Sequence, residues 1–128
     1  MVGNKVLLVD DNPIVRLGTR RILEGHAAVT KFYEAVDGLD ALEKAEALNP
    51  NLVILDLSMP RMNGLAAAAK LKAMKPGIKI ILFTMYPEIV PPEVAKAAGI
   101  SAVVSKTDFA ALKRHAAGLL EGYKSATA

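Results

Sequence analysis

Four short runs of mostly aliphatic residues stand out along this chain, at positions 5–9, 52–57, 79–83 and 102–105. Apolar runs that lack a polar alternation are typical of strands covered on both faces, as in a parallel sheet between two layers of helices. A fifth stretch, 28–35, is rich in β-branched and aromatic residues but alternates weakly. We expect it to form a strand at or near the edge of the same sheet.

Segments with apolar residues at helical spacing separate these strands. Asn12 and Pro13 are typical of an N-cap followed by proline at the first helical position. Asp37 and Gly38 open the second helix, and Thr107 and Asp108 can cap the last one. The connection 85–92 is rich in proline, so the helix after it should be short. The expected helices run from Pro13 to near Gly25, from Gly38 to Leu48, from Leu65 to Met74, from Glu93 to Ala98, and from Phe109 to Leu120, with a frayed tail from Tyr123.

Five strands that alternate with five helices predict an α/β fold with a doubly wound, five-stranded parallel sheet. A length of 128 residues fits a single domain over 1–128, with its core at roughly 4–122. The chain has no cysteine and a net charge of only +3, which does not indicate nucleic-acid binding by itself. Without a secretory signal or a run long enough to span a bilayer, we expect a cytoplasmic protein with no membrane partner.

The unusual polar residues lie where the predicted strands end. Asp10 and Asp11 follow the first strand, Asp56 follows the apolar residues of the third, Thr84 ends the fourth and Lys106 follows the fifth. The carboxyl ends of parallel strands share one edge of the sheet, and ligands bind at that edge. Any one of these residues could simply cap its loop, with Lys106 as a partner for the acids. Their occurrence together at strand ends favours a functional site.

The residue types of this group indicate phosphoryl chemistry with a metal ion. Three carboxylates in one pocket repel one another unless a cation joins them. Oxygen ligands suit Mg²⁺, and the lack of a nearby histidine or cysteine disfavours zinc. Lys106 and Thr84 offer the positive charge and the hydroxyl needed to hold phosphoryl oxygens. Asp56 could then act as the nucleophile and form an acyl phosphate.

These strand-end residues, together with the loop 59–64, resemble the receiver domain of two-component response regulators across essentially the whole chain. The resemblance is greatest to the receivers that precede LuxR-type output domains, and it implies the flavodoxin-like (βα)5 fold. It also implies a role for each residue of the site. Asp56 would be the phosphoacceptor, Asp10, Asp11, Asp56 and the backbone carbonyl of Ser58 would hold Mg²⁺, and Thr84 and Lys106 would bind the phosphoryl group.

By the same resemblance, the chain would be a signalling switch and not an enzyme in the usual sense. It would take its phosphoryl group from a phosphohistidine of a sensor kinase or a phosphotransfer protein, and would catalyse its own phosphorylation and dephosphorylation. We expect no output domain in this chain, and the sequence does not indicate the downstream partner. Many members of the family dimerise when phosphorylated, so a phosphorylation-dependent homodimer is a further expectation.

Two positions depart from the pattern of the family. Val103 stands three residues before Lys106, where receivers usually carry a tyrosine or phenylalanine that moves with the threonine. Pro91 and Pro92 stand at the start of the fourth helix, in a segment that changes on phosphorylation in the family. Signalling would therefore run through the loop after Thr84, or would be weak or different in kind.

Two other functions remain open on the sequence. A receiver-like module could bind a partner protein without ever being phosphorylated, and Val103 keeps that alternative open. A phosphatase of the haloacid-dehalogenase type also uses an aspartate nucleophile with Mg²⁺, but it needs a second aspartate two residues later, where this chain has Ser58. A P-loop nucleotide enzyme is excluded, because the chain contains no Gly-rich loop that ends in Gly-Lys-Ser/Thr.

Overall fold

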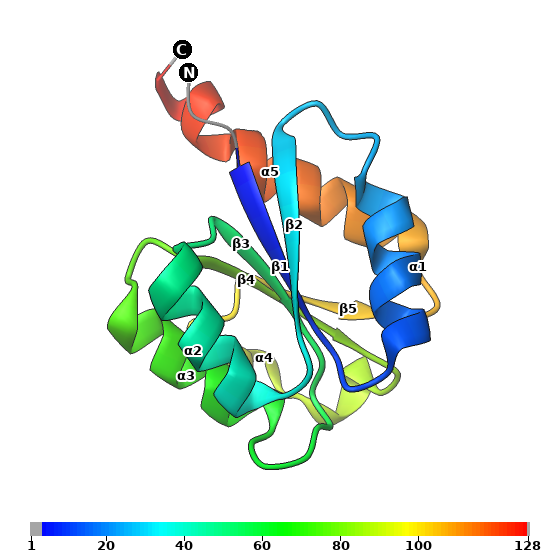
Figure 1. Cartoon of the computed structure of the whole chain (residues 1–128), viewed down its shortest axis with the longest axis vertical. Coiled ribbons are helices and arrows are strands. Elements are labelled where there is room, and N and C mark those ends of the chain that lie inside the picture. The colour runs from blue at the N-terminus through cyan, green and yellow to red at the C-terminus, as the bar shows by residue number, and fades with distance from the viewer. Residues whose placement is uncertain (1–3, 128) are drawn as a thin grey trace.

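Five parallel strands form one sheet in the order β2-β1-β3-β4-β5, and five α-helices flank it (Figure 1). The computed structural model describes residues 4–127, and beyond residue 121 it describes the backbone alone. The doubly wound α/β fold is therefore confirmed, with β2 at the predicted edge. The elements are β1 (Asn4–Val9), α1 (Pro13–Leu23), β2 (Val29–Ala35), α2 (Gly38–Leu48), β3 (Leu52–Leu55), α3 (Gly64–Met74), β4 (Lys79–Thr84), the 3-10 helix η1 (Pro87–Ile89), α4 (Pro92–Ala97), β5 (Ala102–Ser105) and α5 (Phe109–Thr127).

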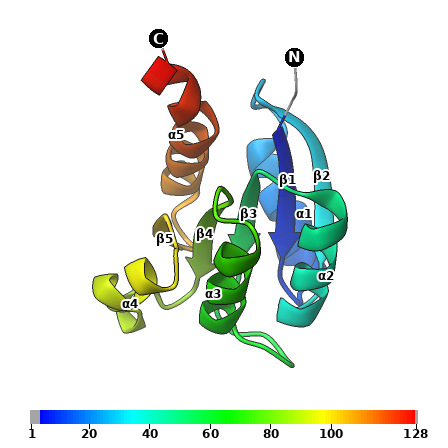
Figure 2. The ribbon, with the colours of Figure 1, turned by 90° about the vertical axis from the view of Figure 1, so that its left-hand side faces the viewer.

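The sheet has a separate hydrophobic core on each face. Helices α1 and α5 cover one face, and α2, α3 and α4 cover the other (Figure 2). Successive side chains of a strand point to opposite faces, so alternate residues of one run enter different cores. In β3, for example, Leu52 and Ile54 pack under α1 and α5, while Val53 and Leu55 pack under α2 and α3. Burial on both faces explains why these strands carry no polar alternation.

Side-chain caps begin the helices close to where the sequence predicts them. The side-chain oxygens of Asn12, Asp37, Asn63 and Asp108 accept hydrogen bonds from backbone N–H groups in the first turn of α1, α2, α3 and α5. Each cap satisfies one of the N–H groups that a helix leaves without an internal partner at its start. The caps fix the loops at the carboxyl edge of the sheet, where the candidate site lies.

The last two helices differ in length from the rest. Helix α4 has only six residues, as the prolines before it predict. Helix α5 continues to Thr127 instead of ending near Leu120, because the stretch after Gly122 contains no proline or glycine that would stop it. The expected tail is thus helical in its backbone. Within residues 4–127, no helix has both the length and the hydropathy needed to cross a membrane.

Gly64 begins α3 against the backbone of the strand end that carries Asp56. A Cβ atom at this position would lie well inside contact distance of the Asp56 carbonyl oxygen, and 3.0 Å from the Leu57 Cα atom. The amide of Gly64 donates a hydrogen bond of 2.8 Å to the Leu57 carbonyl. Only glycine fits this close approach of two backbone segments.

We expect Gly64→Ala to lower the free energy of unfolding by about 1–3 kcal/mol, because the added methyl group meets backbone atoms that cannot easily move. The matched control is Gly118→Ala in α5, where a Cβ atom would meet nothing within 4 Å. That change should raise the free energy of unfolding by roughly 0.5–1 kcal/mol, since alanine is the better helix former. Urea unfolding of both variants measures the two effects, and equal stabilities would contradict the close approach.

Candidate functional site

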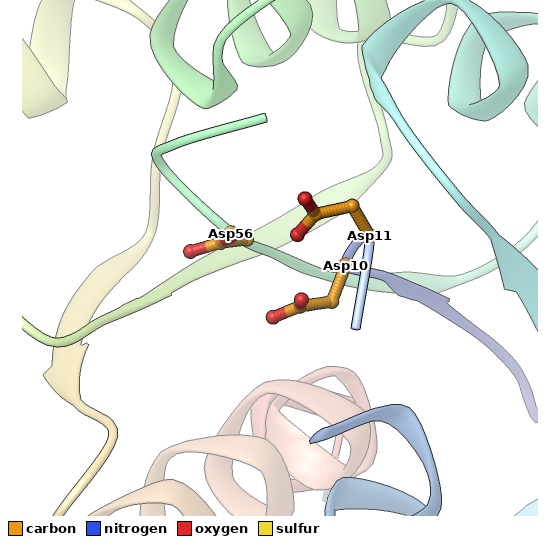
Figure 3. Close-up of side chains that lie close together, drawn as sticks. All are labelled: Asp10, Asp11 and Asp56. Atoms are coloured by element: carbon orange, nitrogen blue, oxygen red, sulfur yellow. The ribbon is translucent and has the colours of Figure 1, made fainter. Parts of the chain in front are cut away.

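Three carboxylates meet at the carboxyl edge of the sheet because β1 and β3 are neighbours. Val9 and Leu55 are paired in the parallel register, and the Asp56 amide donates a hydrogen bond of 3.0 Å to the Val9 carbonyl. This pairing places Asp56 beside Asp10 and Asp11. One carboxylate oxygen from each of the three lies within 4.8 Å of the others, and Figure 3 shows the side chains grouped at the two strand ends.

Lys106 supplies a positive charge from the end of β5. Its Nζ atom lies 2.8 Å from Oδ2 of Asp10 and 3.1 Å from Oδ1 of Asp56. Both aspartates are almost completely buried, whereas Asp11 is exposed. The other oxygen of Asp10 accepts a hydrogen bond of 2.9 Å from the Asn12 amide. The structure thus brings together four of the predicted residues as one charged group.

The charges of this group shift the pKa values of its members. Burial raises the pKa of Asp56, the charge of Asp10 raises it further, and Lys106 acts in the opposite direction. Burial of Lys106 disfavours its charged form, but the hydrogen bond to Asp10 and the charges of Asp10 and Asp56 outweigh this and raise the pKa of Lys106. The negative charge of Asp56 is therefore costly here unless further positive charge joins the pocket.

The donor set fits a hard divalent cation. Carboxylate oxygens are the ligands that Mg²⁺ prefers, at about 2.0–2.1 Å, so two ligands on opposite sides of one ion are about 4 Å apart. The oxygens of Asp10, Asp11 and Asp56 lie within 4.8 Å of one another, close to that span. Asp11 leaves one side of the group open to solvent, which gives an ion and its remaining waters access.

Thr84 and Ser58 lie on the same edge, with different surroundings. Thr84 ends β4, is 3% exposed, and its hydroxyl oxygen accepts a hydrogen bond of 3.1 Å from the Tyr86 amide. The Lys106 amide donates to the Thr84 carbonyl at 2.8 Å, so the ends of β4 and β5 are joined. Ser58 is exposed in the loop after Asp56. The roles of Thr84 and the Ser58 carbonyl stay predictions.

Sequence reasoning missed the contacts that two arginines make around the site. Arg16 of α1 donates to the backbone carbonyl of Asp10 at 2.7 Å and to Glu34 at 2.7 Å. Arg61 donates through Nε and Nη2 to the two oxygens of Asp37, at 2.7 and 2.9 Å. The pairs Arg16–Glu34 and Arg61–Asp37 join residues 18 and 24 positions apart, so the fold brings them together, whereas Arg16 and Asp10 are only six positions apart.

The fold and the acidic site define the class of this protein, a doubly wound α/β protein with a carboxylate pocket at the carboxyl edge of its sheet. The family model described as the response regulator receiver domain matches residues 6–117. This chain belongs to the response regulator receiver domain family. The resemblance seen in the sequence is therefore confirmed.

Individual relatives support the same assignment. The response regulator protein VraR of Staphylococcus saprophyticus is 36% identical over 103 residues, which cover 80% of this chain and 49% of VraR. A two-component response regulator of the LuxR family from Aurantimonas sp. SI85-9A1 has a TM-score of 0.84 and 31% identity, with 94% of this chain and 87% of that chain covered. The response regulator TrrA of Thermotoga maritima, crystallised in complex with Mg²⁺-BeF, has a TM-score of 0.81 and 32% identity, with 91% and 98% covered.

The comparisons also confirm the similarity to receivers of LuxR-family regulators. This chain spans about half the length of the curated relatives that it matches. The functions of those full-length proteins are therefore only proposed for this chain.

The ion pair of Asp37 should make stability depend on pH. Arg61 lowers the pKa of Asp37 below its ordinary value of 3.8, chiefly through the hydrogen bonds that it donates. A lowered pKa in the folded state stabilises the protein above the unfolded value, and this stabilisation is lost as the pH falls through the folded value. We expect wild type to be more stable than Asp37→Asn at pH 7, with the difference shrinking below about pH 4.

Urea unfolding of both proteins from pH 7 to pH 3 measures that difference. Asparagine also caps helices well, so the substitution removes the charge and leaves the cap of α2. A difference in the free energy of unfolding that stays constant over this range would contradict a stabilising role for the ion pair.

Proposed function

We propose that this chain is a phosphorylation switch that accepts a phosphoryl group on Asp56. The observation that carries the proposal is the group of three carboxylates with Lys106 bound to two of them. A phosphohistidine of a sensor kinase or phosphotransfer protein would be the donor. One oxygen of Asp56 would bond to phosphorus as the P–N bond breaks, and the electron pair of that bond would stay with the histidine nitrogen.

Residues of this chain would perform separate parts of the transfer. Asp10, Asp11, Asp56 and the Ser58 carbonyl would hold Mg²⁺, which supplies positive charge to the phosphoryl oxygens when bound. Lys106 already lies 3.1 Å from the accepting carboxylate, so its Nζ atom is within reach of a phosphoryl group formed there. The same groups would assist hydrolysis of the acyl phosphate. TrrA, crystallised with Mg²⁺-BeF, supports this assignment by its similarity.

The signal would leave the site through the loop after Thr84. The Thr84 hydroxyl accepts a hydrogen bond from the Tyr86 amide, and a hydroxyl that turns to donate to a phosphoryl oxygen would weaken that bond. Val103, at the position where receivers usually carry an aromatic residue, lines a hollow with Pro87, Val90 and Ala95. This route requires no aromatic side chain at position 103. The cytoplasmic location, the single-domain organisation and the phosphorylation-dependent homodimer stay predictions.

The phosphoacceptor is tested by the intact mass after incubation with acetyl phosphate, with and without Mg²⁺. Wild type should gain one phosphoryl group only with Mg²⁺, and Asp56→Asn should gain none, because an amide is a far weaker nucleophile than a carboxylate. Asp108→Asn is the matched control, since Asp108 caps α5 and asparagine can do the same. Labelling of Asp56→Asn to the wild-type extent would refute the site, and no labelling of folded wild type would favour a module that works without phosphorylation.

The metal role is tested by calorimetric titration with Mg²⁺. We expect Asp11→Ala to weaken Mg²⁺ binding by about tenfold or more, because even groups that only support a metal ligand matter to that extent. Glu46→Ala removes the same charge from an exposed position on α2 and should leave the affinity unchanged. An Asp11→Ala affinity equal to that of wild type would rule out Asp11 as a ligand.

A further inference from the structure

The loop between Asp56 and α3 contains a strained turn at Arg61. The Met62 amide donates a hydrogen bond of 2.7 Å to the Pro60 carbonyl, and Arg61 between them has a φ of 65°. A hydrogen bond between residues i and i+2 around a positive φ defines a form of γ-turn that is rare and strained. Such a conformation persists only where its surroundings hold it.

Asp37 holds this turn from the neighbouring loop. Arg61 donates to both carboxylate oxygens of Asp37, a paired geometry that fixes the guanidinium as well as attracting it. Asp37 is itself fixed, because it is 5% exposed and also accepts the Asp40 amide at 2.9 Å as the cap of α2. The strained residue is thus anchored to the start of a helix that packs against the sheet.

Two glycines allow the backbone to come close on either side of this anchor. A Cβ atom on Gly38 would lie 2.7 Å from both the Cβ and the carbonyl oxygen of Met62, so α2 begins directly against the loop. Gly64 lies in the same way against the carbonyl of Asp56. The segment 57–63 is therefore held between the strand end that carries the phosphoacceptor and the first turn of α2.

We propose that Asp37 and Arg61 are positioning residues for the site, acting by holding the loop that carries Ser58 and leads away from Asp56. The inference rests on the proposed function, because the held loop would keep the Ser58 carbonyl in place for Mg²⁺ and would fix the backbone that follows the phosphoacceptor Asp56. Neither side chain touches the reacting atoms. Loss of the pair releases the strained turn, and the ligand set then forms only at an entropic cost.

The experiment measures Mg²⁺ affinity and the hydrogen exchange of the Gly64 amide in wild type, Arg61→Ala, Arg61→Lys and Lys44→Ala. Arg61→Ala should weaken Mg²⁺ binding about tenfold and speed Gly64 exchange relative to amides of β1. Arg61→Lys keeps the charge but loses the paired geometry, so its Mg²⁺ affinity should fall between those of wild type and Arg61→Ala. Lys44→Ala is the matched control, because it removes a cation paired with Asp40 on the same helix, and it should behave as wild type.

An unchanged Mg²⁺ affinity in folded Arg61→Ala would overturn the inference, even if Gly64 exchange became faster, since the pair would then serve stability alone. Wild type that bound no Mg²⁺ would count against the proposed function instead. If wild type binds no Mg²⁺, hydrogen exchange at Gly64 still tests whether the pair holds the loop. Faster exchange in Arg61→Ala supports a held loop, and unchanged exchange refutes it.

Discussion

Repulsion among carboxylates is the constraint around which this structure is organised. Asp10 and Asp56 are buried beside each other, and Asp11 stands at their open side. The Nζ atom of Lys106 lies against both buried acids and offsets part of their repulsion. One positive charge against three negative charges leaves an excess of negative charge, which makes the site receptive to a divalent cation.

The sheet keeps this costly group in place. Strands β1 and β3 lie at its centre, and each is buried on both faces, so neither strand end can withdraw without opening a hydrophobic core. Fully burying a leucine or isoleucine stabilises the fold by about 1.5–3 kcal/mol. Several such side chains in each strand outweigh the repulsion at the edge. The unbroken apolar runs therefore do more than form strands, because they hold the acids together.

The sequence predicts the features of this protein that depend on local residue patterns, and it does not predict the contacts that depend on packing. Local patterns predict both the fold and the members of the acidic group. These patterns are the apolar runs, the caps at Asn12 and Asp108, and the polar residues at the strand ends. The contacts of Arg16 with Glu34 and of Arg61 with Asp37 depend on the packing of separate segments, so no spacing rule reveals them. The extra length of α5 was missed because apolar spacing fades before the helix ends.

The two loops after Asp56 and Thr84 are held by different contacts, and this difference bears on the route by which the proposed switch would signal. The loop after Asp56 is anchored by the Arg61 pair and by two close glycine contacts. At the start of the loop after Thr84, the hydroxyl accepts a hydrogen bond from the Tyr86 amide. In the proposed switch, a phosphoryl group that drew the hydroxyl toward itself would act directly on that bond, whereas the anchored loop would resist displacement. This difference would favour movement of η1 and α4 in the proposed switch, where the prolines would limit the conformations that the moving segment can adopt.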